Sequence, residues 1–222
     1  MKLALFDLDH TLLPLDSDHA WGQFTVALGW RDADTHARAN DAFYEQYKAG
    51  TLDIAEYIRF ATSAAREHGL AAATQAHERF MAEVIRPALR PQAIELVRQH
   101  QAAGDTVVIV TATNEFVTRP IATAFGVDEL IAVELARDAR GEPTGEIHGV
   151  PSFKEGKVAR VEQWLASRGL SWAHVDHSSF YSDSINDLPL LEKVQEPVAT
   201  NPDARLQAIA TERGWRVLNL FE

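Results

Sequence analysis

The sequence predicts an α/β protein with a doubly wound parallel sheet, an inserted helical cap and a small β-hairpin. Two observations lead to this prediction. Short apolar runs alternate with helical segments over most of the chain, a pattern typical of parallel sheets. The alternation is interrupted once, after the first strand, by a long block with helical periodicity and few strand signals. We therefore expect a core formed by residues 1–15 and 88–222 and a cap formed by residues 16–87.

Composition restricts the class of protein and its partners. The chain has 222 residues, of which 46% are hydrophobic, enough to build a sizeable core. Its formal net charge of −11 disfavours nucleic-acid and anionic-membrane partners, because both need basic patches. Cysteine is absent, which excludes disulfides and thiolate metal sites. No apolar stretch is as long as a membrane span, and Asp7 interrupts the first apolar run too early for a secretory signal. We expect a cytoplasmic protein.

The first third of the chain is expected to contain one strand and then helices. Residues 2–6 form a short apolar run of the buried-strand type. In the helical block that follows, Asp53 is expected to be an N-cap, because apolar residues follow it at helical spacing. Gly50 and Gly69 stand where helices are expected to end.

The rest of the chain is expected to alternate between strands and helices. A helix over 91–103 should end at Gly104, and the run TVVIVT (106–111) has the composition of a fully buried strand. The further expected elements are a helix through Phe125, two strands around the turn RGEPTGE within 130–150, a helix from about Lys154 to Arg168, the strand SSFYS, a helix after Asp187, and short strands near Pro197–Thr200 and Trp215–Leu218.

Four stretches place polar side chains at strand ends or at a helix start. They are FDLDHT with Asp7, Asp9 and Thr11; VIVTATN with Thr111; KEGKVARV with Lys157; and FYSDSINDLP with Asp183, Asn186 and Asp187. In doubly wound sheets, ligands bind beyond the carboxyl ends of the strands, so one edge of the sheet could gather all four stretches.

The chemistry of these groups suits a phosphate ester. Clustered carboxylates suit Mg²⁺, a hard cation that takes oxygen ligands and completes its shell with water and phosphate. A carboxylate can also act as a nucleophile and form an acyl-phosphate, which splits one hard step into two. Thr111 and Lys157 would then hold the anionic phosphoryl oxygens.

Taken together and in order, the four stretches resemble the motifs of the haloacid dehalogenase superfamily, and within it those of subfamily IB, the phosphoserine-phosphatase-like branch. The resemblance implies a phosphomonoesterase that acts on a small phosphorylated metabolite and requires Mg²⁺. It also implies a helical cap and assigns roles: Asp7 as nucleophile, Asp9 as general acid and base, Asp7, Asp9 and Asp183 as metal ligands, Thr111, Ala112, Lys157 and Asn186 as phosphate-binding groups, and Thr11 and Asp187 as supporting groups.

Two departures from the phosphoserine phosphatases leave the substrate open. Ala112-Thr113 stands where those enzymes usually carry Gly-Gly, and Ser182-Asp183-Ser184 stands where they usually carry Gly-Asp-Gly. Both changes resemble a sister group that includes histidinol-phosphate enzymes. Phosphoserine and histidinol phosphate are therefore the two leading candidates.

The resemblance also points to two residues for substrate specificity. Asp16, nine positions after Asp7, stands where the phosphoserine phosphatases contact the substrate amine. Arg59, nine residues after Gly50, stands where they pair with a substrate carboxylate. The alternative for Arg59 is a solvated helix residue paired with Glu56. An Arg59 in the site would favour phosphoserine, and an Arg59 in solvent would favour an amine without a carboxylate.

Several alternatives stay open at this point. The protein could be a phosphomutase or another phosphotransferase on the same fold, or a catalytically silent interaction protein; Asp9 argues against a dehalogenase, which lacks the second aspartate. Lys154 competes with Lys157, although Gly156-Lys157 fits the family position better. Thr111 could be only a helix N-cap. His10 should point away from Asp7 and Asp9 if strand geometry persists.

Overall fold

The computed structural model describes residues 1–221. Its centre is a six-stranded sheet in the order β3-β2-β1-β6-β7-β8, with all neighbouring strands parallel. The strands are β1 (Lys2–Phe6), β2 (Thr106–Asn114), β3 (Glu129–Val133), β6 (His177–Ser182), β7 (Glu196–Thr200) and β8 (Arg216–Leu218). The direction of strand order reverses at β1, and such a switch point opens a crevice at the carboxyl ends of the strands.

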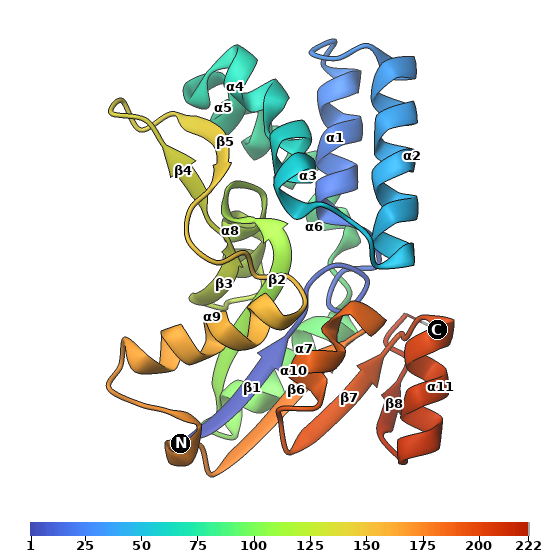
Figure 1. Ribbon diagram of the computed structural model, residues 1–222, viewed down its shortest axis with the longest axis vertical. Helices are drawn as coiled ribbons and strands as arrows, with labels where there is room; N and C mark the ends of the chain where they lie inside the picture. The colour runs from blue at the N-terminus through green and yellow to red at the C-terminus, as the bar shows by residue number, and fades with distance from the viewer. Residues whose placement is uncertain (222) are drawn as a thin grey trace.

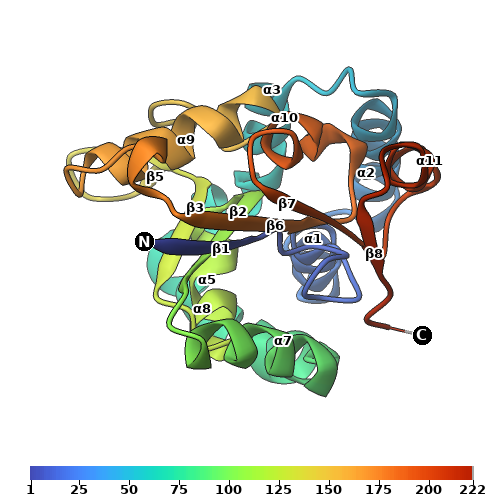
Figure 2. The ribbon, with the colours of Figure 1, turned by 90° about the horizontal axis from the view of Figure 1, so that it is seen from below.

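Helices cover both faces of this sheet, so the predicted doubly wound architecture is confirmed (Figures 1 and 2). One face is covered by α9 (Glu155–Ala166), α10 (Leu188–Leu191) and α11 (Ala204–Arg213), and the other by α7 (Pro91–Ala102) and α8 (Glu115–Ala124). Successive side chains of β1 point to opposite faces. Leu3 and Leu5 join the core under α9 to α11, and Ala4 and Phe6 join the core over α7 and α8.

The helical insertion, residues 17–88, lies beyond the carboxyl end of β1 (Figure 1). It consists of α1 (Ser17–Ala27), α2 (Ala33–Ala49), α3 (Ile54–Ala61), α4 (Ser63–His68), α5 (Leu70–Phe80), a π-helical turn (Met81–Ile85) and α6 (Arg86–Ala88). Asp53 caps α3 by accepting two backbone N–H groups, as predicted. Gly50 ends α2 in the left-handed conformation at φ 71°, which glycine adopts without steric cost. None of the helices within residues 1–221 has the length and apolar character that crossing a membrane requires.

The structure corrects two strand boundaries. β2 continues three residues past Thr111 to Asn114, and the Asn114 side chain, not that of Thr111, caps the next helix by accepting the Val117 N–H. The predicted hairpin is formed by β4 (Leu135–Arg137) and β5 (Pro143–Ile147), while residues 129–133 join the main sheet as β3. Asp138 stabilises the hairpin turn by accepting two backbone N–H groups, and residues 143–146 after the turn continue as β5.

Candidate active site

Lys157 joins two of the predicted site carboxylates. Its ammonium donates to Oδ1 of Asp7 and to Oδ2 of Asp187, each at 2.7 Å, and only 2% of its side chain is exposed. Ser182 also donates its hydroxyl to Asp187. Burial alone would lower the pKa of Lys157, but the charges of Asp187 and Asp7 outweigh burial and raise that pKa. Lys157 is therefore a fixed cation at the end of β1.

The close packing of the first turn of α9 positions Lys157, and Lys154 at the N-cap of that helix points elsewhere. A Cβ at Gly156 would lie 2.1 Å from the carbonyl oxygen of Pro151, so only glycine fits there. Lys154, at the N-cap position of α9, has a left-handed backbone at φ 50° and sends its ammonium to the carbonyl oxygen of Gly50, 2.5 Å away. Of the two candidate lysines, the structure thus places Lys157 against Asp7.

Thr11 lies between Asp7 and Asp183. Its Oγ1 is 3.3 Å from Asp7 Oδ2 and 3.2 Å from Asp183 Oδ1, and it accepts the backbone N–H of Asp183 at 3.0 Å. Both carboxylates therefore face the same small space. Burial raises the pKa of Asp183 well above its usual value, and the charges of Asp7 and Asp187 raise it further.

This pair of carboxylates fits a magnesium ion. Two carboxylates that repel each other in a buried space are stabilised by a cation placed between them. Mg²⁺ is usually held by one or two carboxylates and keeps waters and substrate oxygens as its other ligands, so Asp7 and Asp183 suffice as its side-chain ligands. Among the described residues, no three histidine, aspartate or glutamate side chains are grouped so as to hold an ion by themselves.

Asp9 is held by the start of the helical insertion and by β2. Its Oδ1 accepts the backbone N–H of Ser17, the first residue of α1, at 2.7 Å, and its Oδ2 accepts the hydroxyl of Thr113 at 2.8 Å. Burial raises the pKa of Asp9 to about 8, with help from the charges of Asp16 and Asp7. A carboxyl group that keeps its proton near neutral pH can act as a general acid.

The remaining predicted phosphate-binding residues border the same space. Thr111 and Ala112 line the cavity, and the Thr111 hydroxyl oxygen accepts the backbone N–H of Thr113 at 3.1 Å. Asn186 also lines the cavity, and its side-chain amide donates to the carbonyl of Tyr47 at 3.1 Å. The structure thus brings together residues from the segment after β1, from β2, from α9 and from the segment after β6.

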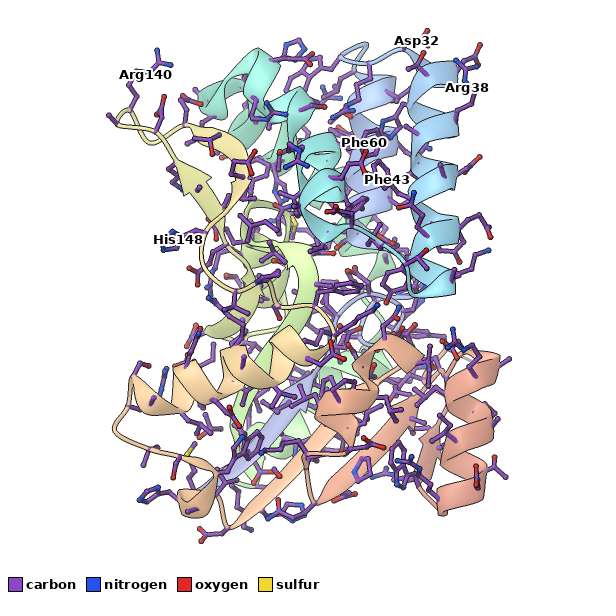
Figure 3. All side chains as sticks on the ribbon, in the orientation of Figure 1. Asp32, Arg38, Phe43, Phe60, Arg140 and His148 are labelled. Carbon is purple, nitrogen blue, oxygen red and sulfur yellow. The ribbon has the colours of Figure 1, made fainter. Side chains whose placement is uncertain are left out.

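A cavity of about 350 Å³ lies over these groups, between the sheet edge and the helical insertion. The insertion supplies its outer wall, which is rich in aromatic and apolar side chains: Phe43, Tyr44, Tyr47, Leu52, Ile54 and Tyr57. Figure 3 shows Phe43 of α2 and Phe60 of α3 close to each other, with ring centroids 5.1 Å apart. This packing holds α2 and α3 together behind the cavity wall.

The two predicted specificity residues lie in different environments. Asp16 lines the cavity and caps α1, accepting the N–H of His19 at 2.8 Å. Arg59 lies outside the cavity; its side chain is 47% exposed and contacts Glu146 of β5 at 3.5 Å. The acidic partner of Arg59 is therefore Glu146 of the hairpin, not Glu56 of its own helix.

The condition on which the expectation for His10 depends, that strand geometry persists, is not met. Strand geometry stops at Phe6, and His10 adopts a left-handed backbone at φ 58° that turns it toward the cavity it lines. Its carbonyl accepts the side-chain amide of Asn201 at 2.9 Å. A positive φ is rare for residues other than glycine and marks a position fixed by its surroundings.

Tyr47, Tyr57 and Thr113 are among the cavity residues to which the sequence predictions give no role. Thr113 lies within the stretch VIVTATN, two residues after Thr111, so its nearness to Asp9 could have been inferred from that position. Tyr57 precedes Arg59 by two residues, and a helix places such residues on different faces, so only one of them could face the cavity. No local signal marks Tyr47, because its position depends on how α2 packs against the core.

A parallel sheet whose switch point presents paired carboxylates and a buried lysine has the groups that an enzyme of phosphoryl transfer needs. The family model of haloacid dehalogenase-like hydrolases matches residues 4–192, and the chain belongs to that family, as a phosphatase. It is 44% identical to a histidinol-phosphatase of Neisseria meningitidis, over 98% of both chains.

Solved structures agree with the fold. A crystal structure of a protein of unknown function from Bordetella pertussis is 50% identical, covers 99% of both chains and superposes with a TM-score of 0.93. A substrate-bound phosphoserine phosphatase is 17% identical, with 98% of this chain and 92% of that chain covered and a TM-score of 0.67. The second likeness concerns the fold alone.

Proposed function

We propose that the protein is a Mg²⁺-dependent phosphomonoesterase that works through an aspartyl-phosphate on Asp7. The main support is the set of contacts at Asp7: one of its oxygens accepts from Lys157 at 2.7 Å, and the other lies 3.3 Å from the Thr11 hydroxyl. The same hydroxyl also contacts Asp183. The carboxylate is thereby fixed in orientation at the switch point. Such preorganisation lowers the cost of bringing it to a phosphorus atom.

The reaction divides into two steps at Asp7. In the first, an Asp7 oxygen bonds to phosphorus, the bond from phosphorus to the ester oxygen breaks, and Asp9 gives its proton to the leaving alkoxide. In the second, Asp9 takes a proton from water, which attacks phosphorus and releases phosphate and free Asp7. Mg²⁺ held by Asp7, Asp183 and the Asp9 carbonyl would neutralise the charge of the phosphoryl oxygens.

Other side chains of the cavity would hold the phosphoryl group during both steps. Lys157 offers a fixed positive charge, and the Thr111 hydroxyl and the backbone N–H of Ala112 offer hydrogen bonds at the end of β2. Asp187 keeps the ammonium of Lys157 in place at 2.7 Å. We assign Asp187 to support of Lys157 on that contact.

The outer part of the cavity favours a substrate with an amine or imidazole and without a carboxylate. Asp16 makes it negative, and Phe43, Tyr44 and Tyr57 give it flat apolar surfaces that suit a ring or a cation. Arg59, which would pair with a carboxylate, lies outside. Histidinol phosphate fits this description better than phosphoserine, and the Neisseria relative is named for histidinol phosphate.

The cations on the cavity wall are already engaged within residues 1–221. Lys48 pairs with Glu45 at 2.5 Å, and Arg205 donates to the carbonyl of Lys48 at 3.1 Å. Lys157 donates to Asp7 and Asp187, at the end of the cavity where the phosphate would bind. A substrate carboxylate would therefore have to compete with these contacts, whereas an ammonium could bind the Asp16 oxygen that does not accept the His19 N–H. We further propose that residues 16–87 act as a cap that determines this selectivity.

The decisive measurement is phosphate release from histidinol phosphate, phosphoserine and p-nitrophenyl phosphate, with Mg²⁺ and then with EDTA. We expect turnover of histidinol phosphate that EDTA abolishes and Mg²⁺ restores, with kcat/KM well above that for phosphoserine. Equal or better turnover of phosphoserine would overturn the substrate assignment only. Absence of metal-dependent turnover on all three would overturn the phosphatase mechanism and favour a silent interaction protein.

A further inference from the structure

The carboxyl end of α2 is held by three side chains of the core. A helix leaves its last carbonyls without partners inside the helix and carries partial negative charge there. In α2, core side chains satisfy these groups directly. The three hydrogen bonds run from Asn186 Nδ2 to the Tyr47 carbonyl at 3.1 Å, from Arg205 Nη1 to the Lys48 carbonyl at 3.1 Å, and from Lys154 Nζ to the Gly50 carbonyl at 2.5 Å.

The three donors come from separate parts of the chain. Asn186 follows β6, Lys154 precedes α9, and Arg205 lies in the first turn of α11. No local sequence pattern could bring them together. Two of them are cations at the negative end of a 17-residue helix, which is the favourable arrangement of charge and dipole.

Lys154 has an unusual backbone that serves this contact. Its φ of 50° and ψ of −124° are outside the conformations that side-chain-bearing residues prefer. Its ammonium lies 5.2 Å from the ring centroid of Phe153 as well as 2.5 Å from the carbonyl oxygen of Gly50. Backbone strain of this kind persists where the surrounding contacts compensate for it, and it gathers at functional sites.

The held end of α2 forms part of the cavity wall. Phe43, Tyr44 and Tyr47 project from its last turns into the lining of the cavity. The hydroxyl of Tyr47 also donates to Ser184 Oγ at 3.0 Å, one residue from Asp183. A shift of this helix end would therefore displace the outer wall and disturb the loop that carries Asp183.

We propose that Lys154 and Arg205 are positioning residues for the reaction, which fix the carboxyl end of α2 over the bound substrate. The inference rests on the proposed function, because a closed wall matters for chemistry only if phosphoryl transfer takes place beneath it. A closed wall excludes bulk water and holds the organic part of the substrate in a reactive orientation. Lys154 thus acts on α2, and Lys157 acts on Asp7.

The test uses Lys154→Met and the double variant Lys154→Met/Arg205→Met, which keep long side chains but remove the charges. We expect kcat/KM for histidinol phosphate to fall by about tenfold in the double variant, through a lower kcat as well as a higher KM. The loss for acetyl phosphate, which is too small to reach α2, should be several times smaller. Lys154→Arg keeps the charge and should restore most of the difference.

Two further measurements separate positioning from a loss of fold. Arg213→Ala on the other end of α11, where the arginine pairs with Glu192, is the matched control and should behave as wild type. Amide hydrogen exchange of residues 43–52 should become faster in the double variant, at an unchanged thermal midpoint. Unchanged exchange there would overturn the proposal whether or not the wild type turns over a phosphate ester. In an active enzyme, equal losses on both substrates would also overturn it.

Discussion

Lys157 and Asp7 form a buried ion pair 2.7 Å long, between the first turn of α9 and the residue that follows β1. These two positions are 150 residues apart in the chain. The pair is therefore both a structural link between distant segments and the centre of the proposed chemistry. The two roles can be separated by substituting one partner at a time.

Replacing the nucleophile should remove activity and preserve the fold. In Asp7→Asn, Lys157 keeps its 2.7 Å bond to Asp187, and Asp183 loses a repelling neighbour, so we expect the free energy of unfolding to change by about 1 kcal/mol or less. Turnover should fall by about 10³-fold or more. Beryllofluoride with Mg²⁺ should raise the thermal midpoint of the wild type and leave that of the variant unchanged. Near-normal turnover in the variant would exclude an aspartyl-phosphate on Asp7.

Replacing Lys157 should lower both activity and stability. Lys157→Met leaves Asp7, Asp183 and Asp187 close together without a positive charge from the protein. Removing one member of a buried charge network costs about 3–5 kcal/mol. Urea denaturation should show this loss, and Mg²⁺ should recover part of it by binding the carboxylates. A variant as stable as the wild type in the absence of metal would contradict the central structural role of Lys157.

Stability should also depend on pH through His77, which joins α5 of the insertion to α8 of the core. Its Nε2 lies 3.0 Å from the carbonyl oxygen of Val117, and the ring packs among Trp21, Phe80 and Phe116. Burial lowers the pKa of His77 from 6.5 to about 4. The unfolded chain therefore binds a proton between these values while the folded chain does not. The free energy of unfolding is therefore highest, as far as His77 is concerned, above pH 6.5, and it decreases as the pH falls from 6.5 toward 4.

The size of this effect can be measured against His77→Gln, which keeps an N–H donor but does not titrate. The pKa difference corresponds to roughly 3 kcal/mol across the window. The difference in unfolding free energy between wild type and variant, measured in urea from pH 4 to 7, should increase with pH over that range. A difference independent of pH would show that His77 titrates alike in the folded and unfolded chains.

The sequence was sufficient to predict the sheet edge because its signals are local. Asp7 and Asp9 interrupt an apolar run, and the buried strand 106–111 leads directly into the second motif. Tyr47 was missed because its contact with Ser184 depends on packing between segments 137 residues apart. The assignment of Arg59 rests on its position nine residues after Gly50, and the alternative rests on its spacing from Glu56, but the hairpin residue that it contacts, Glu146, lies 87 residues away. Periodicity within a helix carries no information about such a partner.

Substrate selectivity should follow Asp16 and not Arg59, and the two residues form a matched pair for the test. Arg59→Ala removes only an exposed contact of 3.5 Å, and such pairs are worth about 1 kcal/mol or less. We expect kcat/KM for histidinol phosphate and phosphoserine to stay within about twofold of wild type in that variant. Asp16→Asn keeps a side chain that can cap α1, so the helix should remain stable.

In Asp16→Asn, the loss of a carboxylate that faces an ammonium should lower kcat/KM for histidinol phosphate by a factor that corresponds to about 2 kcal/mol or more. The value for p-nitrophenyl phosphate, which has no amine, should change much less. The ratio of the two losses isolates binding of the amine from general damage to the site, because both substrates use the same Asp7 and Lys157.

If Asp16→Asn lowers both values equally, Asp16 acts on Asp9 or on α1 and does not recognise the amine. If Arg59→Ala selectively lowers the value for phosphoserine, the guanidinium reaches the cavity in the complex, and the preference for a substrate without a carboxylate is wrong.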